Sequence, residues 1–184
     1  MSSLQSGLLE RAPGVRHGFF TRRGGVSQGE FEALNCSLSS GDSEQALHEN
    51  RRRVTARLGL EEGGLVTLTQ VHSRRVWRVE DPMDFAPARE GDGLVSRRPG
   101  VGLGLLSADC APLLFADAGA GVIGAAHAGW KGALHGVTDE VLDRMAELGA
   151  KRSRIIAAIG PCIQRDSYQV DAAFVECFAA RSPL

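Results

Sequence analysis

The chain has 184 residues, of which 43% are hydrophobic and 23% are charged, and its formal net charge is −1. This composition is typical of a globular protein long enough to bury a core within a single domain, 1–184. The near-neutral charge and the 5% aromatic content exclude the basic, aromatic surface of a nucleic-acid-binding protein.

The first half predicts one helix among loops and short strands. The segment 17–43 is rich in Gly, Ser and Asn, which predicts a strand followed by loops. Asp42, with Gln45 three residues later, predicts a capping box that begins a helix ending at about Leu58, before Gly59. Two strands and then a loop rich in Pro, Gly and acidic residues are predicted next: 65–71, 75–79 and 81–93.

The second half predicts alternating strands and helices. Strands are predicted at 101–106, 113–115, 121–126 and 155–159. Between the last two, apolar residues recur at helical spacing over 134–148, and Gly149 ends that helix. A final helix is predicted from Ala172 to Arg181. This alternation favours a layered α/β architecture over an all-β one.

Three side chains with metal-binding chemistry lie near the ends of predicted strands: His72, Cys110 and His127. One thiol and two imidazoles suit a three-ligand metal centre that keeps a position open. A Cys–His pair also suits a hydrolase that uses no metal. Each of the three residues alone also fits a structural role, as a buried thiol, a strand-end histidine or a core histidine.

Two further residues have both a structural and a functional interpretation. Arg51 belongs to a run of three arginines that is typical of the solvated face of a helix, although a guanidinium also suits an anion. Trp130 begins the region of a predicted helix, where its ring either fills the core or stacks on a planar substrate.

The four cysteines include no Cys-x-x-Cys pair, which argues against a zinc ribbon or a thioredoxin-like motif. The short apolar stretch 7–9 is followed at once by charged residues, so no signal peptide is predicted. Polar residues and a proline interrupt the apolar run that begins at Val101, so no membrane partner is predicted. We therefore expect a cytoplasmic protein with free thiols.

Taken together, the motifs resemble the YfiH-like or laccase-domain family, also labelled multicopper polyphenol oxidase. The matching segments occur in order over nearly the whole chain: 17–27, 34–35, 41–42, 49–51, 69–72, 91–93, 108–112, 127–132, 160–163 and 168–170. The combination is far more specific than any single segment. The family usually continues with a further C-terminal segment, so we expect this chain to lack it.

The resemblance implies an α/β fold, a layered mixed β-sheet sandwich with flanking helices. It implies a metal centre held by His72, Cys110 and His127, with zinc as the metal and copper as the alternative. The implied activity is phosphorolysis of adenosine, inosine and methylthioadenosine, together with deamination of adenosine. The implied partners are a small-molecule nucleoside and phosphate, with no nucleic acid and no membrane; a homodimer stays open.

On this basis we assign further roles as expectations. Arg51, with the metal, handles the charge of the phosphate, and Gln70 or Trp130 contacts the substrate. Cys110 and Asp109 belong to the catalytic group, and Asp109 orients a histidine ligand from behind.

Three other functions stay open. A copper polyphenol oxidase is the first, although five histidines in the chain are few for a multicopper cluster. A hydrolase that uses Cys110 and His127 on a cell-wall precursor is the second. The third is a binding domain without catalytic activity, stabilised by its metal.

Overall fold

The fold is described from a computed structural model, which covers residues 2–85 and 88–180. Its centre is a five-stranded sheet in the order β4 (Val76–Arg78), β5 (Gly93–Ser96), β8 (Val122–Ala128), β7 (Ala111–Asp117), β9 (Ile156–Ile159). β4 and β5 are parallel, and the other neighbouring pairs are antiparallel. This mixed sheet with helices around it confirms the predicted layered α/β class.

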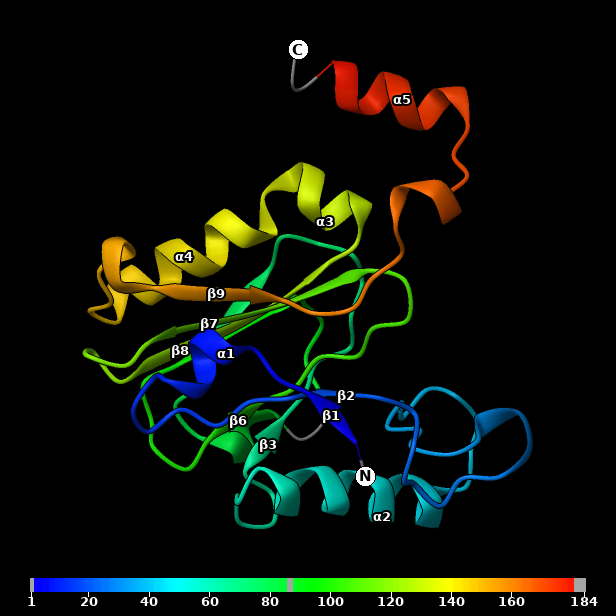
Figure 1. The fold of residues 1–184 in the computed structure, drawn as a ribbon, viewed down its shortest axis with the longest axis vertical. Helices are drawn as coiled ribbons and strands as arrows, with labels where there is room; N and C mark the ends of the chain where they lie inside the picture. Colours follow the sequence, from blue (N-terminus) through cyan, green and yellow to red (C-terminus); the bar gives the residue numbers. More distant parts are fainter. Residues whose placement is uncertain (1, 86–87, 181–184) are drawn as a thin grey trace.

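Helices cover both faces of the sheet (Figure 1). α3 (Trp130–His135) and α4 (Val137–Glu147) lie on one face, and the short α1 (Gly7–Glu10) lies on the other. Because side chains alternate along a strand, β7 serves both layers. Its Leu113 and Phe115 belong to the core cluster under α4, whereas Leu114 and Ala116 pack near Leu9 of α1.

Smaller elements surround the sheet. β1 (Ser3–Leu4) pairs with β2 (Phe19–Phe20), and β3 (Leu65–Val66) pairs with β6 (Gly102–Leu103). α2 (Glu44–Arg57) and α5 (Ala172–Ala179) lie at opposite ends of the molecule, with α5 beyond α3 (Figure 1). Short 3-10 turns lie at 29–31, 82–85, 152–154 and 165–167. Within the described residues, no helix has both the length and the apolar character needed to cross a membrane.

The strand β5 was not predicted, although it lies inside the sheet. Leu94 and Val95 are 0% exposed, one on each face of the strand. A short strand buried on both faces shows no alternation of polar and apolar residues, so its pattern carries little signal. The strands that were predicted exist, but with different lengths. β3 and β6 are shorter than the predicted strands 65–71 and 101–106, whereas β7 and β8 are longer than the predicted strands 113–115 and 121–126.

Two helix predictions were wrong in detail. The single helix predicted over 134–148 is divided at Gly136, which takes a left-handed φ of 82° between α3 and α4. The capping box at Asp42 does not form, because that carboxylate accepts hydrogen bonds from Ser27 Oγ (2.6 Å) and Asn35 Nδ2 (3.0 Å) instead. The predicted end of the last helix, Arg181, lies outside the described residues.

The long loop before α2 is organised around the buried side chain of Asn50. Its Oδ1 accepts from the backbone N–H of Val26 at 2.8 Å. Its Nδ2 donates to Ser27 Oγ at 2.8 Å and to the carbonyls of Ala33 at 3.2 Å and Asn35 at 2.8 Å. One side chain therefore holds four residues of this loop against α2.

Asn50→Ala should lower the free energy of unfolding by about 2–4 kcal/mol, because it leaves several buried polar groups without partners. Urea denaturation measures this loss. The control is Arg52→Ala on the same helix, which removes only an exposed ion pair with Glu49 and should leave the midpoint nearly unchanged. Equal losses in the two variants would contradict the role given to Asn50.

Candidate metal centre

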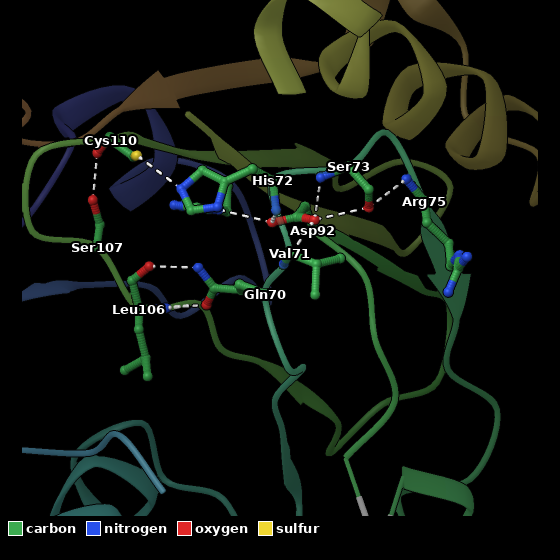
Figure 2. A network of polar contacts seen from close by, with 10 residues as sticks. Gln70, Val71, His72, Ser73, Arg75, Asp92, Leu106, Ser107 and Cys110 are labelled. Carbon is green, nitrogen blue, oxygen red and sulfur yellow. Dashed lines mark hydrogen bonds and ion pairs between the residues drawn. The ribbon is translucent and has the colours of Figure 1, made fainter. Parts of the chain in front are cut away.

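The fold brings His72, Cys110 and His127 together from three separate segments. Their donor atoms all lie within 4.8 Å of one another, and this is the one such group found in the described residues. Cys110 Sγ lies 3.7 Å from His72 Nε2 (Figure 2). The centroids of the His72 and His127 rings are 4.9 Å apart. The predicted metal-binding chemistry is therefore present in one place.

Strand pairing explains how two of the three residues meet. β7 and β8 are antiparallel with Pro112 opposite His127, so Cys110, just before β7, lies at the same end of the sheet. His127 is buried, Cys110 is half-buried and His72 is exposed. The group is thus buried in the protein on the side of His127 and open to solvent on the side of His72.

The state of the Cys110 thiol bears on the choice between a metal ligand and a free nucleophile. Burial raises the pKa of this thiol, and the negative charges of Asp109 and Asp92 raise it further. A cysteine nucleophile that works without a metal needs a lowered pKa. The surroundings of Cys110 therefore argue against a nucleophile that works without a metal.

The carboxylate that orients a histidine of this group is Asp92, not Asp109. Asp92 Oδ1 lies 2.9 Å from His127 Nδ1, and both side chains are buried, whereas Asp109 is exposed. Burial opposes ionisation of Asp92, yet hydrogen bonds from His127, Ser73 and His72 hold its pKa at about 2. An ionised Asp92 accepts a hydrogen bond from the Nδ1–H of His127, which leaves Nε2 of His127 free to bind a metal.

Gln70, which is expected to contact the substrate, holds the segment that leads to Cys110 (Figure 2). Its Nε2 donates to the carbonyl of Leu106, and its Oε1 accepts from the Leu106 N–H, both at 2.7 Å. Ser107 Oγ then donates to the carbonyl of Cys110. The amide of Gln70 therefore acts on the metal group through the backbone of this loop.

Gln70→Ala should weaken metal binding by about 10-fold, because the loop that carries Cys110 loses both hydrogen bonds to this side chain. Competition against a chromophoric chelator measures the affinity. Gln164→Ala is the control, since that amide is exposed and donates to the carbonyl of Cys162. Unchanged affinity in Gln70→Ala would show that the loop holds its shape without the amide.

The two other expected substrate residues have partners outside the metal group. Arg51 donates to Thr67 Oγ1 at 3.0 Å and to the carbonyl of Cys36 at 3.4 Å. The ring of Trp130 packs against α5, with centroid distances of 5.2 Å to Phe174 and 6.5 Å to Phe178.

Gly129 provides the space in which the three residues converge. A Cβ at this position would lie 2.5 Å from His72 Cδ2 and 2.9 Å from Cys110 Sγ. The φ of Gly129 is −68°, so the need for glycine comes from space and not from backbone conformation. A closely packed set of two imidazoles and a thiol fits a zinc or copper ion.

Comparison with known proteins shows the family to which the chain belongs. A family model described as "Multi-copper polyphenol oxidoreductase laccase" matches residues 16–184. The chain belongs to this laccase-like YfiH family.

Relatives of this chain are named for an activity other than the one in the description of the family model. The chain is 45% identical to a purine nucleoside phosphorylase of Deinococcus radiodurans, over 88% of this chain and 63% of the relative. It is 39% identical to a purine nucleoside phosphorylase of Corynebacterium glutamicum, over 92% of this chain and 69% of the relative. The chain thus spans about two thirds of the length of these relatives.

Solved structures agree with the assignment of fold. YfiH of Bacillus licheniformis superposes with a TM-score of 0.83 and 34% identity, covering 91% of this chain and 65% of that one. YlmD of Geobacillus stearothermophilus gives a TM-score of 0.80 and 36% identity, covering 91% and 66%.

Sequence reasoning missed two residues that contact or border the metal group, Asp92 and Gly129. A weak signal existed for Asp92, which stands between Gly91 and Gly93 immediately before an apolar run. A Cβ at Gly93 would lie 2.7 Å from Val76 Cγ2, so close strand packing requires this glycine. A charged residue at such a tightly packed position needs a buried partner, which the sequence alone did not identify.

Proposed function

We propose that this laccase-like chain carries the catalytic centre of a metal-dependent purine nucleoside phosphorylase. The observation that carries the proposal is the convergence of His72, Cys110 and His127 in a chain 45% identical to a protein of that name. The chain spans 63% of the length of that relative. That this length of chain carries the phosphorylase activity is therefore part of the proposal.

The donor set fits a metal ion, held by His72, Cys110 and His127. Zinc is our first choice because catalytic zinc sites use three protein ligands of these kinds, histidine and cysteine among them, and keep a fourth position open. Such an ion supplies a Lewis acid that stabilises developing negative charge. Copper and polyphenol oxidation are the alternative, favoured by the description of the family model. Against it, the chain has five histidines, and two belong to this group.

In phosphorolysis, a phosphate oxygen forms a bond to C1′ of the ribose while the bond from C1′ to the purine nitrogen breaks. The electron pair goes to the purine, which takes up a proton, and the products are ribose 1-phosphate and the free base. In this chain Asp92 keeps the Nδ1 proton of His127 in place, so that this ring presents Nε2. The exposed side of His72 leaves room for a ligand to approach.

Arg51 is proposed as the phosphate-binding residue. Its described hydrogen-bond partners, Thr67 and the carbonyl of Cys36, are uncharged. Burial lowers the pKa of this guanidinium, as expected for a charge that is only partly solvated. A half-buried cation with neutral partners suits an anionic ligand, and the planar guanidinium matches phosphate oxygens.

We further propose adenosine, inosine and methylthioadenosine as substrates, deamination of adenosine as a side activity, and the cytoplasm as the location. The location rests on the four cysteines, all free thiols in the described structure. A homodimer is compatible with this proposal and is not required by it.

The test is the release of hypoxanthine from inosine by the purified full chain, with and without inorganic phosphate. We expect base release that requires phosphate and yields ribose 1-phosphate, and that is lost in His72→Ala. If metal-loaded protein releases no base from any of the three nucleosides, the proposed phosphorylase activity is overturned. Oxidation of a phenol by dioxygen in copper-loaded protein would instead support the polyphenol oxidase.

A further inference from the structure

One buried carboxylate contacts both histidine-bearing segments of the metal group. Asp92 is 0% exposed. Its Oδ1 accepts from the His127 ring at 2.9 Å and from the backbone N–H of His72 at 3.0 Å. Its Oδ2 accepts from the Ser73 N–H at 2.6 Å, from Ser73 Oγ at 2.8 Å and from the Val71 N–H at 3.3 Å. Figure 2 shows the contacts from the segment 71–73 converging on Asp92.

The backbone at His72 adopts an unusual conformation that these contacts stabilise. His72 has a φ of 57°, the one left-handed non-glycine residue among those described. This region of backbone space is unfavourable for a residue with a Cβ. Three consecutive N–H groups, from Val71 to Ser73, point at one carboxylate, an arrangement that binds anions. The negative charge of Asp92 thus favours the turn that aims His72 at Cys110.

The same carboxylate acts on His127 in a different way. Here it contacts the ring itself at Nδ1, which favours the tautomer that carries the proton on Nδ1 and leaves Nε2 for a metal. The carbonyl of Asp92 also accepts from the His127 N–H at 2.8 Å, which fixes the strand beneath that ring.

We propose that Asp92 is a positioning residue that sets both histidine ligands at once, the backbone turn of His72 and the ring tautomer of His127, so that the site is formed before metal binds. This inference rests on the proposed metal centre. It makes metal affinity depend on a residue that does not touch the ion.

The test compares Asp92→Asn with wild type in the full chain. The variant keeps the shape of the side chain but exchanges one acceptor oxygen for a donor, which faces N–H groups. We expect zinc affinity, measured by competition with a chromophoric chelator, to fall by about 10–100-fold. In metal-stripped protein, the ring ¹⁵N chemical shifts should place the proton of His127 on Nδ1 in wild type and lose that preference in the variant.

Asp117→Asn is the matched control. Asp117 is also buried, at 1% exposed, and accepts from backbone N–H groups and from Arg154, at the other end of β7. Both variants should lose stability, but only Asp92→Asn should lose zinc affinity. If Asp92→Asn does not fold, Ser73→Ala removes one contact to Oδ2 and should weaken zinc binding less, without changing the tautomer of His127.

The outcomes separate this inference from the proposed function. Wild-type zinc affinity in Asp92→Asn, or an unchanged His127 tautomer, would overturn the positioning role while leaving the metal centre intact. A wild-type chain that takes up no metal through these three residues would overturn the proposed function. The ¹⁵N measurement on metal-stripped protein would then still decide whether Asp92 sets the ring.

Discussion

Cys110→Ser should empty the metal centre, leaving less than about a tenth of the metal per chain that the wild type retains after dialysis. A thiolate is the strongest of the three donors for zinc or copper, and a serine hydroxyl does not replace it at neutral pH. Elemental analysis of freshly purified protein measures the ratio of metal to chain. The fold should persist, because the change is nearly isosteric and Cys110 is only half-buried.

Cys162→Ser is the control for this prediction. Cys162 is also a half-buried free thiol, and it does not belong to the described metal group. We expect it to retain the metal content of the wild type. Full metal content in Cys110→Ser would exclude Cys110 as a ligand and would remove the basis of the centre.

Gly129→Ala should abolish metal binding as completely as loss of a ligand does, although it alters no donor atom. The added methyl group would lie 2.5 Å from His72 Cδ2 and 2.9 Å from Cys110 Sγ, distances that require one or both side chains to move away. Alanine tolerates the φ of −68° at this position, so strain of the backbone does not explain the loss. Metal content after dialysis and the thermal midpoint of the stripped protein should be measured together.

Gly7→Ala is the control for the glycine substitution. Position 7 begins α1, and a Cβ there would meet no atom within 4 Å. This variant should bind metal like the wild type. Normal metal content in Gly129→Ala would mean that the ligands converge in a different geometry from the one described.

The metal group was predictable from the sequence because its residues stand in distinctive local motifs. His72, Cys110 and His127 each end or begin an apolar strand, and their chemistry suggested a shared role before any geometry was known. Their distances follow from strand pairing between segments far apart in the chain. The pairing of β7 with β8 supplied this information, and no local pattern encodes it.

The residues around the group were harder to assign. Asp92 acts through a turn twenty residues earlier in the chain, so its partners become visible only when 71–73 folds against it. Gln70 was expected to contact the substrate on the basis of the family resemblance, and the hydrogen bonds of its amide to the backbone of Leu106 become visible only in the folded chain. The missed strand β5 shares this cause, since its burial arises from neighbours on both faces and leaves no periodic pattern.

The most direct test of the account is the phosphorolysis of inosine by chelator-stripped protein as zinc is added back. We expect no turnover without metal, activity that rises to a plateau at about one zinc per chain, and no activation of His127→Ala at any zinc concentration. Copper in the same titration should not produce phosphate-dependent release of the base. Phosphorolysis that survives complete removal of the metal would contradict the claim that His72, Cys110 and His127 form its catalytic centre.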